Sequence, residues 1–315
     1  INLFGVSISG KFQVFFGFTK IVAVGGIIGI TLTGFSTGNI SHFSDPFWPE
    51  EFGWHTILAI GAALRYSFFA FSGWEGATYL AEEVKEPGKT LPLSLLLGIS
   101  GIMILYLGAN IGYIYQLDIE TIKENKWVAT KAVQTVLGAS GGILISIAVA
   151  INAFGNISTQ ILCKGRSWHA MARDGLFFDY FKNLHPVYAT PNNALIGQGI
   201  WATILLIGAI TSTYYQSGSQ GNNTYEIIID FFSATSTVFN ILTFGSIYIL
   251  RKKLNNVHRP YKAFLYPWSM VIVLLLYTSF LILTLITAFV PSLIGFFLTA
   301  TGTIYYLKKV KPLAK

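Results

Sequence analysis

The chain has 315 residues, of which 53% are hydrophobic, 15% aromatic and only 11% charged. A soluble globular domain carries roughly 25% charged residues, so this composition excludes a disordered chain and a coiled coil and argues against an ordinary soluble enzyme. The single cysteine excludes a disulfide framework and a cysteine-based metal site. The net charge of +7 would suit a nucleic-acid-binding protein only if the basic residues shared one exposed face.

Eight stretches of the sequence are apolar enough, and long enough, to cross a bilayer as helices, which takes about 20 mostly apolar residues. In chain order they are Phe12–Gly34, Trp54–Ala81, Leu91–Tyr115, Leu137–Leu162, Asn193–Ile210, Tyr225–Leu250, Leu265–Val290 and Pro291–Leu307. The last two are predicted to meet in a tight hairpin at Pro291. The pattern predicts an all-α polytopic membrane protein with eight transmembrane helices.

The basic residues outside these spans are distributed unevenly between the two sides of the membrane. If the spans alternate in direction, sixteen Lys and Arg residues fall on the side of both termini, and only Lys123, Lys126 and Lys131 fall on the other. Cytoplasmic loops carry the excess of Lys and Arg, so both termini are predicted to be cytoplasmic. The basic residues then face anionic lipid, which removes the argument for a nucleic-acid partner.

The second span is predicted to be broken. Trp54–Ala81 has 28 residues and would be about 42 Å long as a straight helix, whereas the hydrocarbon core is only about 30 Å thick. Its middle, from Phe69 to Gly76, contains two glycines and a carboxylate. Broken helices expose backbone groups that hydrocarbon cannot satisfy, and in secondary transporters such breaks line the substrate site. The competing interpretation is a long tilted helix whose glycines serve packing.

The residues around this break resemble those of a known family. Phe69 to Trp74, followed by Ala81 to Pro87, is similar to the amino acid–polyamine–organocation superfamily, and most of all to its L-type amino acid transporter branch. Gly165 to Phe178 and Arg259 to Trp268 resemble later motifs of the family in the same order. The resemblance covers nearly the whole chain and implies the LeuT-type inverted-repeat transporter fold, which has twelve helices.

The resemblance also assigns a place to each span. Residues 1–34 would hold the last helix of the first inverted repeat, residues 54–250 the five helices of the second repeat, and residues 265–315 two peripheral helices and a cytoplasmic tail. The opening residues from Ile1 read like an interhelical loop. We therefore expect a truncated chain that lacks the first four family helices, one of which forms half of the substrate site, and that cannot transport alone.

Lys20 lies about 13 Å into the first span, near the bilayer midplane, where a buried ammonium needs oxygen partners. In the resembling family, a lysine at this place substitutes for a sodium ion and bridges two helices. Mapped onto this sequence, its partner would come from the fourth span, at Asn156, Ser158 or Thr159. The resemblance therefore implies sodium-independent transport. The alternative is a lysine that faces a local lipid defect.

The predicted substrate site is the break itself. The resemblance makes Phe69 an aromatic lid over the substrate and lets the backbone at Ser72 and Gly73 contact its ammonium group. The neighbouring residues Phe71, Trp74 and Glu75 complete the predicted substrate-binding set.

Glu75 stands where the eukaryotic L-type branch often has asparagine. Its carboxylate could titrate or attract a substrate ammonium. It could equally be an anion that caps the start of the second half-helix.

Arg65 and Asp230 both fall in the outer half of the membrane. Arg65 is four residues before Phe69 and shares its helical face. One hypothesis is an extracellular gate, an ion pair that forms when the site closes over the substrate. The other interpretations are a permanent structural pair, or an Arg65 that points into an outer vestibule.

Together these features favour a plasma-membrane, multi-pass permease that exchanges one amino acid for another by alternating access, without sodium. The alternative is a proton-coupled amino acid or amine permease that uses Glu75. An enzyme would need clustered catalytic groups and a channel a ring-forming pore motif, and the sequence has neither. We expect no cofactor and no metal, an amino acid substrate and the lipid bilayer as partners, and either a homodimer or a single-span partner subunit.

Overall fold

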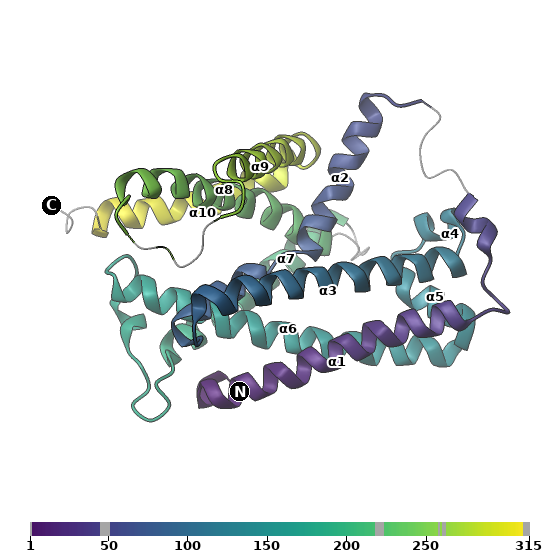
Figure 1. Cartoon of the computed structure of the whole chain (residues 1–315), viewed down its shortest axis with the longest axis horizontal. Helices are drawn as coiled ribbons and strands as arrows, with labels where there is room; N and C mark the ends of the chain where they lie inside the picture. The colour runs from purple at the N-terminus through teal and green to yellow at the C-terminus, as the bar shows by residue number, and fades with distance from the viewer. Residues whose placement is uncertain (1, 45–50, 218–223, 258, 260–262, 311–315) are drawn as a thin grey trace.

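The computed structural model describes residues 2–44, 51–217, 224–257, 259 and 263–310, and all regular structure in these residues is helical (Figure 1). The α-helices are α1 (Val6–Thr33), α2 (Trp54–Ala70), α3 (Pro87–Gln116), α4 (Ile119–Glu124), α5 (Val128–Leu137), α6 (Ala139–Arg173), α7 (Asn192–Ser217), α8 (Thr224–Lys253), α9 (Trp268–Thr287) and α10 (Phe289–Tyr305). The short helices are η1 (Asn2–Phe4), η2 (Ile40–Ser44), η3 (Trp74–Glu83), η4 (Asp179–Lys182) and the π-helical η5 (Tyr306–Val310).

The eight predicted spans are confirmed as helices. In the described residues, eight helical segments have the length and hydropathy needed to cross a membrane, and each coincides with one predicted stretch. Many large apolar side chains point outward, among them Val14 at 75% and Phe297 at 73% exposure. Such exposure would be costly in water and is what lipid-facing helices require, so the chain is a multi-pass membrane protein.

Two predicted helix boundaries are wrong. The fourth span was expected to end at Leu162, but α6 continues to Arg173. No proline occurs before Asp174-Gly175, and Gly165 is buried within the helix at a close contact with Leu195. Hydropathy measures the apolar stretch and not the length of the helix. The last two spans meet at Ala288 and not at Pro291, which lies in the first turn of α10, where its missing N–H leaves no bond unmade.

The connection between the third and fourth spans contains two short helices, α4 and α5. The Asp118 side chain caps α4 by accepting a hydrogen bond of 2.7 Å from the Thr121 N–H. A hydrogen bond from the Thr121 hydroxyl, together with this backbone bond, lowers the pKa of the Asp118 carboxyl. The helix α5 buries Ala132 and Val133 against α6, which neither hydropathy nor charge counting indicates.

The predicted break in the second span is confirmed. α2 ends at Ala70, and Gly73 adopts φ +98°, a left-handed conformation that glycine reaches without steric cost. The chain then continues as η3. The expected second half-helix is therefore a 3₁₀ helix over Trp74–Glu83 and not an α-helix.

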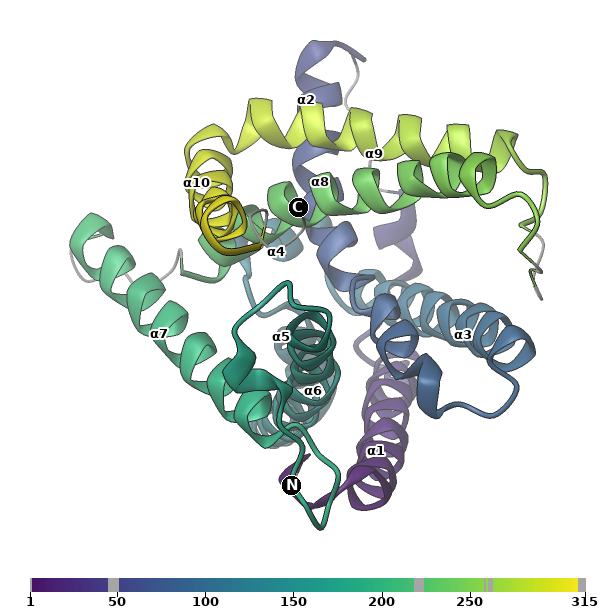
Figure 2. The same cartoon turned by 90° about the vertical axis from the view of Figure 1, so that its left-hand side faces the viewer.

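The long helices form two packed groups. One contains α1, which contacts α3 and α6, and the other contains α8, which contacts α9 and α10. In Figure 2, α8 and α9 lie side by side across the top of the view, while α1, α3 and α6 are seen more nearly end-on. α2 contacts α8 and α9, and η3 contacts α3 and α6, so the two parts of the broken span connect the groups.

Candidate functional site

The backbone of the break is stabilised by neighbouring side chains. The Ser72 hydroxyl donates to the Phe69 carbonyl at 2.7 Å, and the Tyr106 hydroxyl of α3 donates to the Ala70 carbonyl at 3.1 Å. The Gly73 N–H donates to Oε2 of Glu75 at 3.0 Å. A helix that stops inside a membrane leaves such groups without partners, so these three bonds make the break tolerable.

A cavity of about 150 Å³ opens beside the break. Four of the six predicted substrate residues line it, and the other lining residues come from α2, α3, α8 and α9. The lining residues are Phe68, Phe71, Ser72, Trp74, Glu75, Ile99, Ser236, Asn240 and Tyr277. The wall thus combines four aromatic side chains and one aliphatic side chain with three neutral polar groups and one carboxylate, a composition typical of small-molecule sites.

The other two predicted residues, Phe69 and Gly73, are not in this lining. The Phe69 ring makes an edge-to-face contact with Phe232 of α8, with centroids 5.6 Å apart. Gly73 supplies the left-handed turn that starts η3. The lid role of Phe69 and the substrate contact of Gly73 remain predictions.

Glu75 has two contacts that hold its carboxylate at the cavity wall. Oε2 accepts a hydrogen bond from the N–H of Gly73, and Gly73 is the residue that precedes η3. This contact is expected for an anion that caps the start of a helix. Oε1 lies 3.6 Å from Nζ of Lys164, a residue in the C-terminal part of α6 that was not predicted from the sequence to lie at the site. Nζ of Lys164 also lies 5.4 Å from the ring centroid of Tyr79, within the range of a cation–π contact.

Lys20 and Asn156 are brought together at the contact between α1 and α6. Nζ of Lys20 donates a hydrogen bond to Oδ1 of Asn156. The other two predicted partners, Ser158 and Thr159, do not bind Lys20 in this arrangement. They bind Gln13, which donates to the Ser158 hydroxyl at 3.3 Å and accepts from the Thr159 hydroxyl.

The helices α1 and α6 approach closely at this contact because Gly155 has no side chain. A Cβ at Gly155 would lie 2.6 Å from the Phe16 ring, which is buried with 8% exposure. Gln13 was not predicted from the sequence, although one signal was available. It is a polar residue seven positions before Lys20, which puts it two turns away on the same face of the helix.

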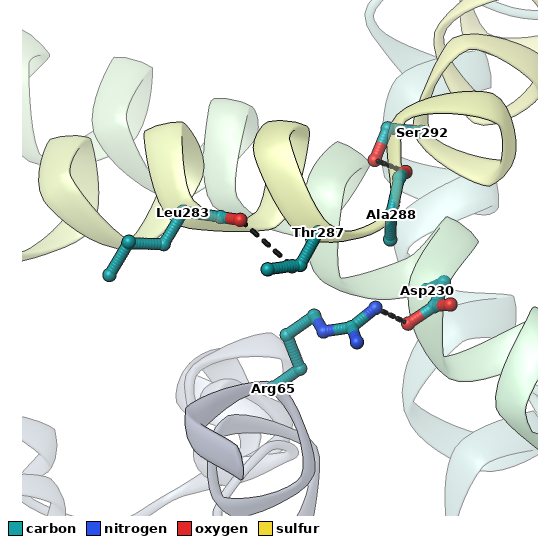
Figure 3. Close-up of polar contacts among 6 residues, drawn as sticks. All are labelled: Arg65, Asp230, Leu283, Thr287, Ala288 and Ser292. Atoms are coloured by element: carbon teal, nitrogen blue, oxygen red, sulfur yellow. Dashed lines mark hydrogen bonds and ion pairs between the residues drawn. The ribbon is translucent and has the colours of Figure 1, made fainter. Parts of the chain in front are cut away.

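Arg65 of α2 and Asp230 of α8 form an ion pair, shown in Figure 3. Both side chains are largely buried, with 10% exposure for Arg65 and 17% for Asp230. Figure 3 shows the pair beneath the junction of α9 and α10, near Thr287 and Ala288. The buried Nε of Arg65 has no hydrogen-bond partner, so the guanidinium is held mainly through Nη1. The predicted gating residues thus meet, and whether they open and close remains a prediction.

No metal site is evident in the part of the chain that the structure describes, where no group of three or more His, Cys, Asp or Glu residues could hold an ion. Besides Lys164, the structure adds Ser236, Asn240 and Tyr277 to the candidate site. For Asn240 a signal was available, because it is an amide in the middle of an apolar span.

The amino acid permease family model matches residues 1–307, so the chain belongs to this family of membrane permeases, which are not enzymes. Individual relatives are distant. The human cystine/glutamate transporter is 25% identical over 308 residues, which is 98% of this chain and 58% of that protein. The rabbit b(0,+)-type amino acid transporter 1 is 27% identical, over 83% of this chain and 50% of that protein. The mouse large neutral amino acids transporter small subunit 2 is 27% identical, over 82% of this chain and 46% of that protein. The chain thus spans about half the length of these relatives.

Proposed function

We propose that this chain belongs to an amino acid exchanger with the LeuT-type inverted-repeat fold, in which residues 54–250 are the second repeat. The observation that carries the proposal is the broken second span with its small cavity, lined by Phe71, Ser72, Trp74 and Glu75. The family and the names of these relatives, all of them transporters of amino acids, support the same conclusion.

The chemistry of the break suits an amino acid. The substrate carries one carboxylate and one ammonium, and a broken helix presents backbone carbonyls and N–H groups that bind such charges with little reorganisation. In this arrangement those groups are bonded to Ser72, Tyr106 and Glu75. Substrate binding would exchange some of these internal bonds for bonds to the ligand, and rocking of one helix group against the other would then change the accessible side.

The contact between Lys20 and Asn156 supports a sodium-independent mechanism. A sodium ion between two helices requires several oxygen ligands. Here the ammonium of Lys20 donates a hydrogen bond to Oδ1 of Asn156 in α6, so this oxygen is already engaged. Its positive charge would repel a second cation at the same place. A fixed charge of this kind supplies the bridge between helices without drawing on an ion gradient.

The test is transport into vesicles by the protein expressed from its complete reading frame. We expect uptake of a labelled amino acid to depend on unlabelled amino acid inside the vesicle and to be unchanged when external sodium is replaced by choline. Lys20→Met should abolish or strongly reduce exchange, whereas Lys11→Met, on the exposed start of the same helix, should not. Uptake driven by a sodium gradient in the unmodified protein would contradict the proposal.

A proton-coupled permease is the second candidate, because Glu75 is the one carboxylate among the residues that line the cavity. Its signature would be alkalinisation of the external medium during net uptake into empty vesicles, lost in Glu75→Gln. Exchange without proton movement would reject this candidate.

We place the protein in the plasma membrane with the ends of this chain in the cytoplasm, on the basis of the sixteen basic residues on that side. In a Cys163→Ser background, Lys182→Cys and Lys123→Cys should then react with a membrane-impermeant reagent from opposite sides. For the oligomeric state we consider two arrangements, a homodimer and a heterodimer with a single-span subunit. One relative is named as a small subunit. Co-purification and mass determination distinguish the two.

A further inference from the structure

The ion pair between Glu75 and Lys164 joins the two sides of the candidate site. Glu75 belongs to η3, immediately after the break, and Lys164 belongs to α6. The two residues are 89 positions apart in the sequence, so their contact is a product of the fold. They are half-buried, with 26% and 37% side-chain exposure, and the pair is therefore partly shielded from water.

The carboxylate of Glu75 is oriented by contacts that both of its oxygens make. One accepts from the Gly73 N–H at 3.0 Å, and the other faces Lys164 Nζ at 3.6 Å. The ammonium of Lys164 is in turn placed over the Tyr79 ring, at 5.4 Å from the centroid. Each charged group therefore has a second contact besides the ion pair, Gly73 for Glu75 and Tyr79 for Lys164. These contacts fix the position of the pair at the edge of the cavity.

Charge at the cavity wall selects ligands by their net charge. The lining residues other than Glu75 are aromatic, aliphatic or neutral polar, so Glu75 alone would give the wall a negative charge. A carboxylate without a nearby cation attracts ligands that carry an extra positive charge and repels those with an extra negative charge. With the Lys164 ammonium beside it, the wall is electrically balanced.

We propose that Lys164 is a specificity-determining residue, which neutralises Glu75 and thereby restricts the site to amino acids whose side chains are uncharged. The inference rests on the proposed function, since it concerns the substrate class of the same cavity. Lys164 acts from outside the cavity lining, through Glu75, and so it is a positioning residue and not one that touches the substrate.

The experiment measures the ratio of arginine to leucine transport, as relative kcat/KM, for the protein expressed from its complete reading frame. Lys164→Met removes the charge and keeps the length and apolar stem of the side chain. We expect this variant to raise the ratio by about tenfold, because an unbalanced carboxylate at the wall then favours the cation. Lys164→Arg, which restores the charge, should keep the ratio of the unmodified protein.

The matched control is Lys182→Met, which removes another lysine engaged in an ion pair, here with Asp179 in η4, away from the cavity. Its ratio should not change. The reciprocal variant Glu75→Gln leaves the ammonium unbalanced and should shift preference toward glutamate. The double variant Glu75→Gln/Lys164→Met should return to neutral substrates, and a purely structural lysine would not produce this rescue.

The outcomes separate the two proposals. If the unmodified protein exchanges no amino acid, the proposed function fails. If the unmodified protein exchanges amino acids, but Lys164→Met and Glu75→Gln both show its preference among arginine, leucine and glutamate, the role of Lys164 is overturned. If Lys164→Met does not fold, the glutamate shift in Glu75→Gln and its reversal in the double variant still decide the question.

Discussion

The buried ion pair of Arg65 and Asp230 gives the sharpest stability prediction. In Asp230→Asn the carboxylate becomes a neutral amide of nearly the same shape, while the guanidinium of Arg65 stays 90% buried and its Nε already has no partner. Breaking a buried pair by removing one charge typically costs about 3–5 kcal/mol. Because the Asp230 side chain is 17% exposed, we expect the lower end, about 3 kcal/mol.

The assay is unfolding by sodium dodecyl sulfate in mixed micelles, followed by circular dichroism, for the four members of a double-mutant cycle. Arg65→Met alone should also destabilise. The double variant Arg65→Met/Asp230→Asn should be more stable than the sum of the single changes predicts, with a coupling of about 2 kcal/mol. The control Glu120→Gln makes the same kind of change in the exposed pair with Lys123 and should cost less than about 1 kcal/mol.

The same cycle distinguishes a gate from a permanent pair. If the pair forms only when the site closes over its substrate, saturating amino acid should increase the coupling, whereas a permanent pair should show the same coupling with and without it. A coupling below about 1 kcal/mol under both conditions would refute the reasoning from burial.

Glycines at close helix contacts and in the break provide the remaining stability predictions, all measured in the same unfolding assay. Gly155→Ala should cost about 1–3 kcal/mol, because its methyl would meet Phe16 at 2.6 Å, whereas Gly25→Ala, with open space around it, should be neutral or stabilising by up to about 1 kcal/mol. Gly73→Ala should cost about 1–2 kcal/mol because of its φ of +98°, whereas Gly76→Ala, where an added methyl would make an ordinary contact, should change stability by less than about 1 kcal/mol. Equal effects within either pair would contradict these assignments.

Much of the fold could be predicted because it depends on local composition. The eight spans follow from the match between apolar length and bilayer thickness, and the break follows from Gly73 and Gly76 in a segment too long for the hydrocarbon core. The helix ends were less predictable. α6 continues past Leu162 because no proline interrupts it and Gly165 is held inside it by packing, although the membrane-length requirement is already met.

The candidate site was predictable in part. Four residues that follow from the break line the cavity, since they are neighbours in the chain. Phe69 was assigned to the site by resemblance, but its ring contacts Phe232, because the side chain's direction depends on how α2 is rotated against α8. Rotation about a helix axis is set by packing, and the apolar pattern of a lipid-exposed helix does not record it.

By itself, the sequence determined that this is a polytopic membrane protein with one interrupted span and a few isolated charges at membrane depth, because each of these properties resides in a continuous stretch of chain. The tertiary structure decided which charges meet. The pairs Lys20–Asn156, Arg65–Asp230 and Glu75–Lys164 join residues far apart in sequence. Among these, only the Glu75–Lys164 pair was wholly unforeseen, because hydropathy had placed Lys164 beyond the end of its span. The continuation of α6 and its contact with η3 bring that lysine back to the break.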